Sequence, residues 1–168
     1  VVRVQQGRRD DAIALFDRAL ATDPDYRPAY NNKALALTES GAHEAAAEIC
    51  RVGLALDGDD AQLNLLFGLA LRNLNRHDEA EPALRRTLEL EPDNASALSN
   101  LGVVLAETGR REEAVRAFLQ AVNRNPCAHS SSVGFQQRRR AGVRLLYDTL
   151  PARLAMRDDL EALISGPR

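Results

Sequence analysis

A step of 34 residues recurs along the chain and constrains its fold more than any other feature of the sequence. Alanine shows this step most clearly, because it stands at the same point of four successive copies: Ala12, Ala46, Ala80 and Ala114. A fixed period of this length is typical of a solenoid, in which short units stack on one another, and not of a chain with one globular core. The sequence therefore predicts a repeat architecture.

Each copy contains two segments with helical periodicity. In the cleanest copy, residues 95–126, Leu101 and Leu105 mark the apolar stripe of the first segment and Phe118 marks that of the second. Gly109 separates the two segments. The pattern predicts two amphipathic helices joined by a tight turn. Because no single pair can bury both stripes alone, we expect neighbouring pairs to stack.

The period also sets the expected helix bounds. Helices are predicted at about 27–40, 44–56, 61–74, 78–90, 95–108 and 112–124. Before them, residues 1–6 are expected to end a truncated first helix that Gly7 closes, and the next helix is expected to run from Asp10 to about Thr22. An acid is expected in the first turn of each second helix, where the helix dipole favours negative charge: Asp10, Glu44, Asp78 and Glu112.

The period fails after Pro126. Residues 127–134 are expected to form a loop, and residues 135–150 a helix that Pro151 ends, with a shorter helix after it. We expect this C-terminal loop and these helices, residues 127–168, to cap the last apolar face of the array. The alternative is that they begin a further domain.

These residues resemble the tetratricopeptide repeat, a 34-residue helix–turn–helix unit with small, aromatic and proline places in a fixed order. With Ala95 as place one, the matches are Leu101, Gly102, Ala114, Phe118 and Pro126; the preceding copy matches at Phe67, Gly68, Ala80, Leu84 and Pro92. The copy from Arg27 departs at Lys33, Cys50 and Gly58. The resemblance covers residues 1–126 and implies an all-α, right-handed superhelix of antiparallel helix pairs, with one truncated and three complete repeats.

The resemblance also implies a peptide-binding groove on the concave surface, which the first helix of each pair lines. The residues expected to form it are Asn31, Asn32, Leu35, Leu65, Leu66, Leu69, Arg72, Asn73, Ser99, Asn100 and Val103. Leu35, Leu69 and Val103 would form an apolar strip for an amphipathic helix or an extended segment. Asn32 and Asn100 would offer amides to a peptide backbone, as in arrays with an asparagine ladder.

One binding mode of the family is not expected, and another is expected to be short. Gln62 and Leu66 stand where arrays that clamp a C-terminal carboxylate carry basic residues, so this clamp is not supported. Leu66 also interrupts the asparagine ladder between Asn32 and Asn100.

The sequence disfavours several classes of function. The net charge of −2 gives no field that would steer nucleic acid, and no apolar run reaches the roughly 18 residues of a membrane span. His43 and His77 are expected to be exposed turn residues too far apart to share a metal ion, and Cys50 is expected to be a buried apolar residue. No catalytic motif, metal-ligand spacing or cofactor fingerprint is found. We therefore expect no catalytic residue, no metal and no cofactor in a protein that is not an enzyme.

We expect a protein–protein interaction scaffold whose groove binds a peptide or a helical segment of another protein. Two alternatives stay open: a substrate-recruiting arm of a larger enzyme, such as a glycosyl- or sulfotransferase, and a scaffold that forms homo-oligomers through its repeat ends. Lys33 is the only lysine, and this arginine bias is typical of a GC-rich genome. No signal-peptide pattern is found, and we expect a bacterial, cytoplasmic protein.

Overall fold

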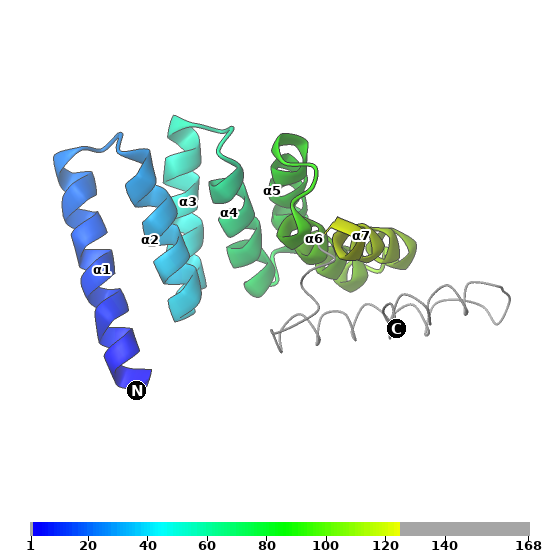
Figure 1. The fold of residues 1–168 in the computed structure, drawn as a ribbon, viewed down its shortest axis with the longest axis horizontal. Coiled ribbons are helices and arrows are strands. Elements are labelled where there is room, and N and C mark those ends of the chain that lie inside the picture. The colour runs from blue at the N-terminus through cyan, green and yellow to red at the C-terminus, as the bar shows by residue number, and fades with distance from the viewer. Residues whose placement is uncertain (1, 125–168) are drawn as a thin grey trace, which may run out of the picture.

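A chain of helices makes up the described part of the protein. The computed structural model describes residues 2–124, with the side chains of residues 8–122, so the expected C-terminal loop and capping helices lie outside the described residues. Figure 1 shows the helices following one another in chain order along one elongated array. Their bounds are α1 (Val2–Thr22), α2 (Arg27–Ser40), α3 (His43–Leu56), α4 (Ala61–Asn73), α5 (His77–Leu90), α6 (Ala95–Glu107) and α7 (Arg111–Arg124).

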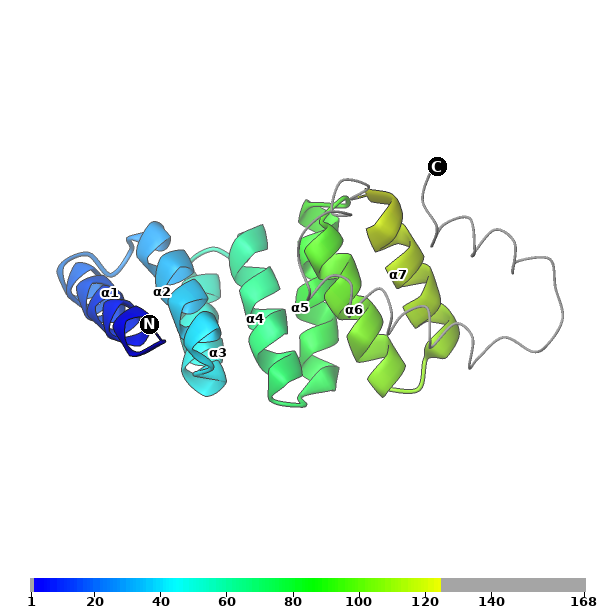
Figure 2. The ribbon, with the colours of Figure 1, turned by 60° about the horizontal axis from the view of Figure 1, so that its bottom comes forward.

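The helices pack as hairpins, α2 with α3, α4 with α5 and α6 with α7, and each hairpin stacks on the next. The first helices also contact one another, α2 with α4 and α4 with α6, whereas within residues 2–124 no comparable contact joins α3 to α5 or α5 to α7. The array therefore curves with its concave side on the layer of α2, α4 and α6. Figure 2 shows the same succession from another side, with α1 and α7 at opposite ends. The predicted all-α solenoid is confirmed, and α2 to α7 begin and end within one residue of the predicted bounds.

Short polar residues cap the starts of α4 and α6, and a left-handed residue lies in the turn after the first helix of each hairpin. The Oδ1 atoms of Asp60 and Asn94 accept hydrogen bonds from the third backbone N–H of α4 and α6, each at 2.9 Å. The turn inside each hairpin contains one residue in the left-handed region at the same place of the repeat. These residues are Gly41 (φ 81°), Asn75 (φ 59°) and Gly109 (φ 81°). Because L side chains are strained there, glycine and asparagine fix the turn positions.

The predicted break at Gly7 is wrong. α1 runs from Val2 to Thr22 without interruption, although Gly7 stands at the same place of the period as Gly41 and Gly109. A glycine in a helix interior costs only about 1 kcal/mol relative to alanine, so it ends a helix only where packing rewards the turn. Asp10 consequently lies inside α1, whereas the other three predicted acids lie in first turns as expected.

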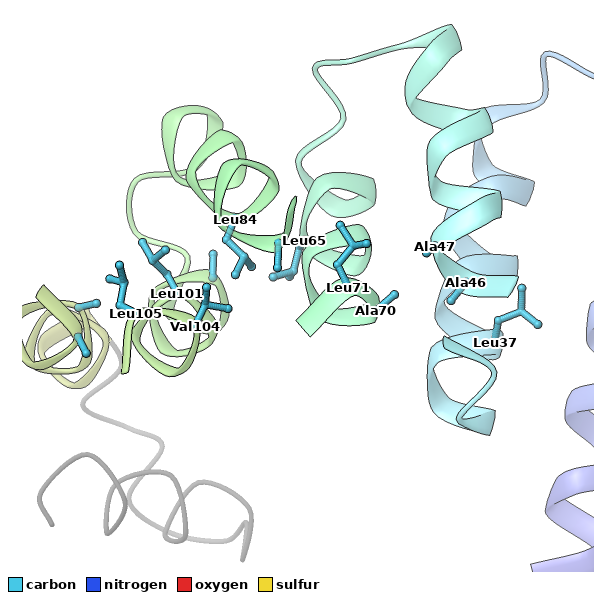
Figure 3. Packing of buried hydrophobic residues seen from close by; sticks show 14 residues of the cluster. Leu37, Ala46, Ala47, Leu65, Ala70, Leu71, Leu84, Leu101, Val104 and Leu105 are labelled. Atoms are coloured by element: carbon cyan, nitrogen blue, oxygen red, sulfur yellow. The ribbon is translucent and has the colours of Figure 1, made fainter. Parts of the chain in front are cut away.

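The core runs along the array, as Figure 3 shows for Leu37, Leu71 and Leu105, which occupy the same place of three repeats. Within each hairpin, place eight of the first helix faces place 24 of the second, and the two residues have complementary sizes. Gly68 leaves room for Leu84, since an added Cβ at Gly68 would lie 2.7 Å from Leu84 Cγ. Gly102 faces Phe118 in the same way, at 2.8 Å from Phe118 Cε1.

The hairpin of α2 and α3 fills the same space differently. It has the larger Ala34 at place eight and the smaller Cys50 at place 24, and both are fully buried in one cluster. This exchange of sizes explains why Cys50 can replace the aromatic residue of the repeat pattern. The full burial of the Cys50 side chain confirms the prediction that it is a buried apolar residue. Burial raises the pKa of the Cys50 thiol to about 12, with a smaller contribution from the charge of Asp60.

Candidate functional site

The predicted groove residues separate into buried and accessible groups. Leu65, Leu66 and Asn100 are buried, at 8%, 3% and 1% exposure. The others remain at least partly accessible on α2, α4 and α6: Asn31, Asn32, Leu35, Leu69, Arg72, Asn73, Ser99 and Val103. We call the accessible residues of this list the first-helix face.

Leu65 and Leu66 pack inside the array. Leu66 belongs to the core cluster that contains Ala34 and Cys50, and so it joins α4 to the preceding hairpin. Leu65 belongs to the long cluster that includes Leu84. Side chains covered to this extent offer almost no surface to a ligand, so we leave both out of the proposed binding surface.

Asn100 has a different environment from the one expected. Its Nδ2 donates a hydrogen bond to the backbone oxygen of Ser96 at 2.7 Å, and its Oδ1 accepts one from the Arg72 guanidinium. With both polar atoms engaged at 1% exposure, its amide is not offered to a peptide backbone in this structure. Asn100 instead orients Arg72, which also donates to Asn73 Oδ1 at 2.8 Å.

Asn31 links two successive first helices. Its Nδ2 donates to Asp60 Oδ2 at 2.8 Å, so the N-terminal cap of α4 is also tied to α2. The Asn31 Oδ1 is buried and has no hydrogen-bond partner among the described residues. Asn32, its neighbour, is exposed. The asparagines of the predicted ladder therefore differ, because Asn32 is accessible and Asn100 is not.

Three apolar side chains form the accessible strip of the first-helix face. Leu35 is 41% exposed on α2, and Leu69 and Val103 are half-buried at the same place of α4 and α6. Leu69 also packs against the core, which fixes its position. Helices that pack side by side lie about 8–10 Å apart, so the strip offers apolar contacts at roughly that interval.

A row of polar links joins successive repeats along one edge. Each link connects the residue at place 17 of one repeat with the residue at place 13 of the next, 30 positions later. The distances are 3.5 Å for Arg9 Nε to Glu39 Oε2, 3.5 Å for His43 Nδ1 to Asn73 Nδ2 and 3.1 Å for His77 Nε2 to Glu107 Oε2. The expectation that the two histidines are exposed is therefore wrong, since both are half-buried in these links. Complementary polar residues at an offset of 30 would have been the sequence signal.

An ion-pair network joins the second helices on the other side. Glu81 of α5 accepts hydrogen bonds from Arg85 and from Arg110, which also contacts Glu113. Burial of Glu81 opposes its ionisation, but the hydrogen bonds from the two arginines outweigh this effect and lower the pKa of Glu81. This network holds hairpins together and is remote from the first-helix face.

The described residues contain no set of three ligating side chains placed to hold a metal ion. Among the helices of residues 2–124, none has the length and apolar character needed to cross a membrane.

Comparison with known protein families decides what kind of repeat this is. The family described as Tetratricopeptide repeat matches residues 2–61 and 65–127. The chain belongs to the tetratricopeptide repeat family. This result confirms the resemblance on which the predicted first-helix surface was based. A comparison with curated proteins finds no match.

Several solved structures of tetratricopeptide repeat (TPR) proteins share the fold. The crystal structure of MamA aligns with a TM-score of 0.74 at 23% identity, over 87% of this chain and 81% of that one. YrrB, described as a TPR protein with an unusual peptide-binding site, aligns with a TM-score of 0.65 at 21% identity, over 86% and 78%. The first TPR of Spaghetti (RPAP3), bound to the HSP90 peptide SRMEEVD, aligns with a TM-score of 0.60 at 26% identity, over 63% and 84%.

Proposed function

We propose that this TPR array is a protein-interaction scaffold that binds a segment of another protein on its first-helix face. The proposal depends on one observation above all: Leu35, Leu69 and Val103 stay accessible at the same place of three successive first helices. YrrB and the first TPR of Spaghetti, which share the fold, are described with a peptide-binding site and with a bound peptide. These two proteins support a protein segment as the class of ligand. The sequence of that segment has to be found by experiment.

The links between repeats prepare this surface for binding. Asn31 to Asp60 and Arg72 to Asn100 each join two first helices, so the spacing of the strip is set before a ligand arrives. A surface that is already ordered loses less conformational entropy on binding. In this proposal, Arg72, Asn73 and Ser99 provide polar contacts beside the strip, and Leu65, Leu66 and Asn100 support it from inside.

The spacing of the strip restricts the ligand. An interval of about 10 Å corresponds to seven residues of an α-helix, which rises about 1.5 Å per residue. In an extended polyproline-type segment, which rises about 3.1 Å per residue, it corresponds to three residues. The ligand is therefore expected to carry apolar side chains at i, i+7 and i+14 if it is helical, and at i, i+3 and i+6 if it is extended.

Two matched leucine variants test the proposal. Leu35 on α2 is 41% exposed and Leu56 on α3 is 43% exposed, so each can be replaced by serine with a similar loss of exposed apolar surface. Covering a leucine fully gains about 1.5–3 kcal/mol, so covering the remaining exposed share of Leu35 gains about 0.6–1.2 kcal/mol. Leu35→Ser is thus expected to weaken binding about three- to eightfold.

The ligand for this test is a peptide selected from a phage-displayed random library against the parent protein. Its affinity for the parent, Leu35→Ser and Leu56→Ser proteins is measured by fluorescence anisotropy. The proposal predicts a loss for Leu35→Ser and an unchanged affinity for Leu56→Ser. An equal loss for both variants, or a loss for Leu56→Ser alone, would place binding elsewhere.

A further inference from the structure

Two glutamates lie beside the apolar strip, at the C-terminal ends of their helices. Glu39 is in the last turn of α2, and Glu107 is the last residue of α6. Each follows a strip residue, Leu35 or Val103, by four positions, so the glutamate and the apolar residue lie on the same side of the helix. Their side chains are 52% exposed for Glu39 and 49% exposed for Glu107. We call these two residues the edge glutamates.

The helix ends at this edge favour positive charge. The C-terminal end of an α-helix carries a partial negative charge, which destabilises a nearby carboxylate and stabilises a nearby cation. The polar links at place 13 lie along one edge, so the C-terminal ends of α2, α4 and α6 line this edge together. Neither α2 nor α6 has a basic residue in its last turn. The edge glutamates therefore add negative charge where the helix ends already provide it.

The chain itself compensates the edge glutamates only in part. Arg9 Nε lies 3.5 Å from Glu39 Oε2, which is longer than the roughly 2.7–2.9 Å of a charge-assisted hydrogen bond. His77 Nε2 lies 3.1 Å from Glu107 Oε2, and an imidazole neutralises a carboxylate only when it is protonated. Arg110, three residues after Glu107, instead joins the ion-pair network of the second helices. A cation from a ligand would therefore meet two half-exposed carboxylates whose charge is incompletely compensated.

The middle repeat has the opposite character. Asn73 occupies the place of the edge glutamates in α4, and Arg72 beside it provides a basic residue in the last turn. The side-chain charge of these last turns is therefore negative in α2, positive in α4 and negative in α6. A bound segment that is complementary to this order carries cations near its two ends and none near its centre.

We infer that the segment bound on the first-helix face is amphipathic and basic, with a lysine or arginine beside its first and its third apolar side chain. This inference rests on the proposed function, because the segment has to lie along Leu35, Leu69 and Val103. The edge glutamates are two repeats apart, which corresponds to about 20 Å at about 10 Å per repeat. That span takes about six residues of an extended segment or about 13 residues of an α-helix. It matches the span between the outer apolar side chains, so one register satisfies both the strip and the edge glutamates.

Parallel selections from one phage-displayed random library give the first test. One selection uses the parent protein, and the other uses a double variant with Glu39→Gln and Glu107→Gln, which removes both charges and keeps the shape of the side chains. Peptides selected on the parent are expected to carry lysine or arginine beside the first and third apolar residues. Peptides selected on the double variant are expected to keep the apolar spacing and to lack this basic enrichment. Parent-selected peptides without the enrichment would overturn the inference.

The affinity of one parent-selected peptide gives the second test. Glu39→Gln and Glu107→Gln are each expected to weaken binding about two- to fivefold at low salt, which is the range of an exposed ion pair. The difference from the parent is expected to shrink in about 1 M sodium chloride, because salt screens exposed charges. Glu91→Gln is the matched control, because it makes the same charge change at an exposed residue that follows α5, and it is expected to leave the affinity unchanged.

Charge exchange and stability separate a direct contact from a structural role. Glu107→Lys is expected to weaken binding of the basic peptide, and a peptide with glutamate in place of the basic residue beside its third apolar side chain is expected to recover it. The urea midpoints of Glu39→Gln and Glu107→Gln are expected to equal or exceed that of the parent, because a carboxylate is unfavourable at a helix C-terminus. A loss of affinity that is matched by a loss of stability would assign the edge glutamates a structural role and overturn the inference.

The Leu35→Ser protein distinguishes failure of this inference from failure of the proposed function. If Leu35→Ser weakens binding of the selected peptide and the two glutamine variants do not, the inference is overturned and the proposed function stands. If Leu35→Ser leaves binding unchanged, the peptide binds elsewhere, and both are overturned. Losses with Leu35→Ser and with both glutamine variants, but not with Glu91→Gln, are the result that the inference predicts.

Discussion

Gly68→Ala and Leu84→Cys, singly and together, test whether place eight and place 24 are matched in size. A Cβ at position 68 would lie 2.7 Å from Leu84 Cγ and 2.8 Å from Leu84 Cδ2. Ordinary carbon contacts are about 3.5–4.0 Å, so Leu84 or its helix must shift by about 1 Å. Overpacking of this kind costs about 1–3 kcal/mol, and the higher helix propensity of alanine offsets about 1 kcal/mol of it. Gly68→Ala alone is therefore expected to cost about 1 kcal/mol.

Leu84→Cys alone removes part of a fully buried side chain and is expected to cost about 2–3 kcal/mol. The double variant reproduces the Ala34 and Cys50 pair of the hairpin formed by α2 and α3. The new Cβ enters the space that the leucine has left. The loss of unfolding free energy in the double variant is therefore expected to be smaller, by about 1–2 kcal/mol, than the sum of the losses in the two single variants.

Urea unfolding followed by circular dichroism at constant m-value measures the whole cycle. A smaller loss of stability in the double variant than in the two single variants together would show that places eight and 24 share one space. Additive costs, within about 0.5 kcal/mol, would refute the size-matching argument and with it the explanation for Cys50.

Two further predictions concern titratable groups. In a Cys127→Ser background, Cys50 is expected to resist iodoacetamide in the native protein, because burial raises the pKa of its thiol to about 12. It is expected to react after urea unfolding. Rapid labelling of the native protein would contradict the burial of Cys50 in the core. Glu81→Gln is expected to cost about 0.5–1 kcal/mol at neutral pH after solvent screening. Because the pKa of Glu81 is lowered in the folded state, this contribution is present above its ordinary value of 4.5 and is lost as pH falls through the folded pKa. Urea unfolding is measured between about pH 6 and about pH 3. The difference in unfolding free energy between parent and Glu81→Gln should become smaller as the pH falls, and a constant difference would count against the ion pairs.

Most of the fold could be predicted because the turns and the apolar stripes repeat in register. Gly41 and Gly109 mark two turns, and the helices on either side have the expected bounds. Gly7 stands at the same place as these two glycines, yet α1 continues through it. A turn forms only where both helices of a hairpin gain by packing, and that gain depends on the surrounding chain.

The depth of the predicted groove residues could not be predicted, because the place of a residue in the repeat fixes the side of the helix but not how deeply its side chain is buried. Leu66 fills the core beside the small residues Ala34 and Cys50, and Asn100 has its amide engaged by Arg72. Both outcomes depend on residues of another helix. The links at an offset of 30 positions, such as His77 to Glu107, were missed for the same reason. Periodicity within one repeat contains no information on pairs between repeats.

The central claim is that a protein segment binds along Leu35, Leu69 and Val103, and methyl NMR tests it most directly. Leucine and valine methyl groups are labelled in the parent protein, and spectra are recorded as the selected peptide is added. The account predicts that the largest shift changes occur at Leu35, Leu69 and Val103. Val52 and Leu56 on α3, which are 40% and 43% exposed, are expected to stay unchanged as internal controls. Shift changes centred on Val52 and Leu56, with the strip unaffected, would contradict the account.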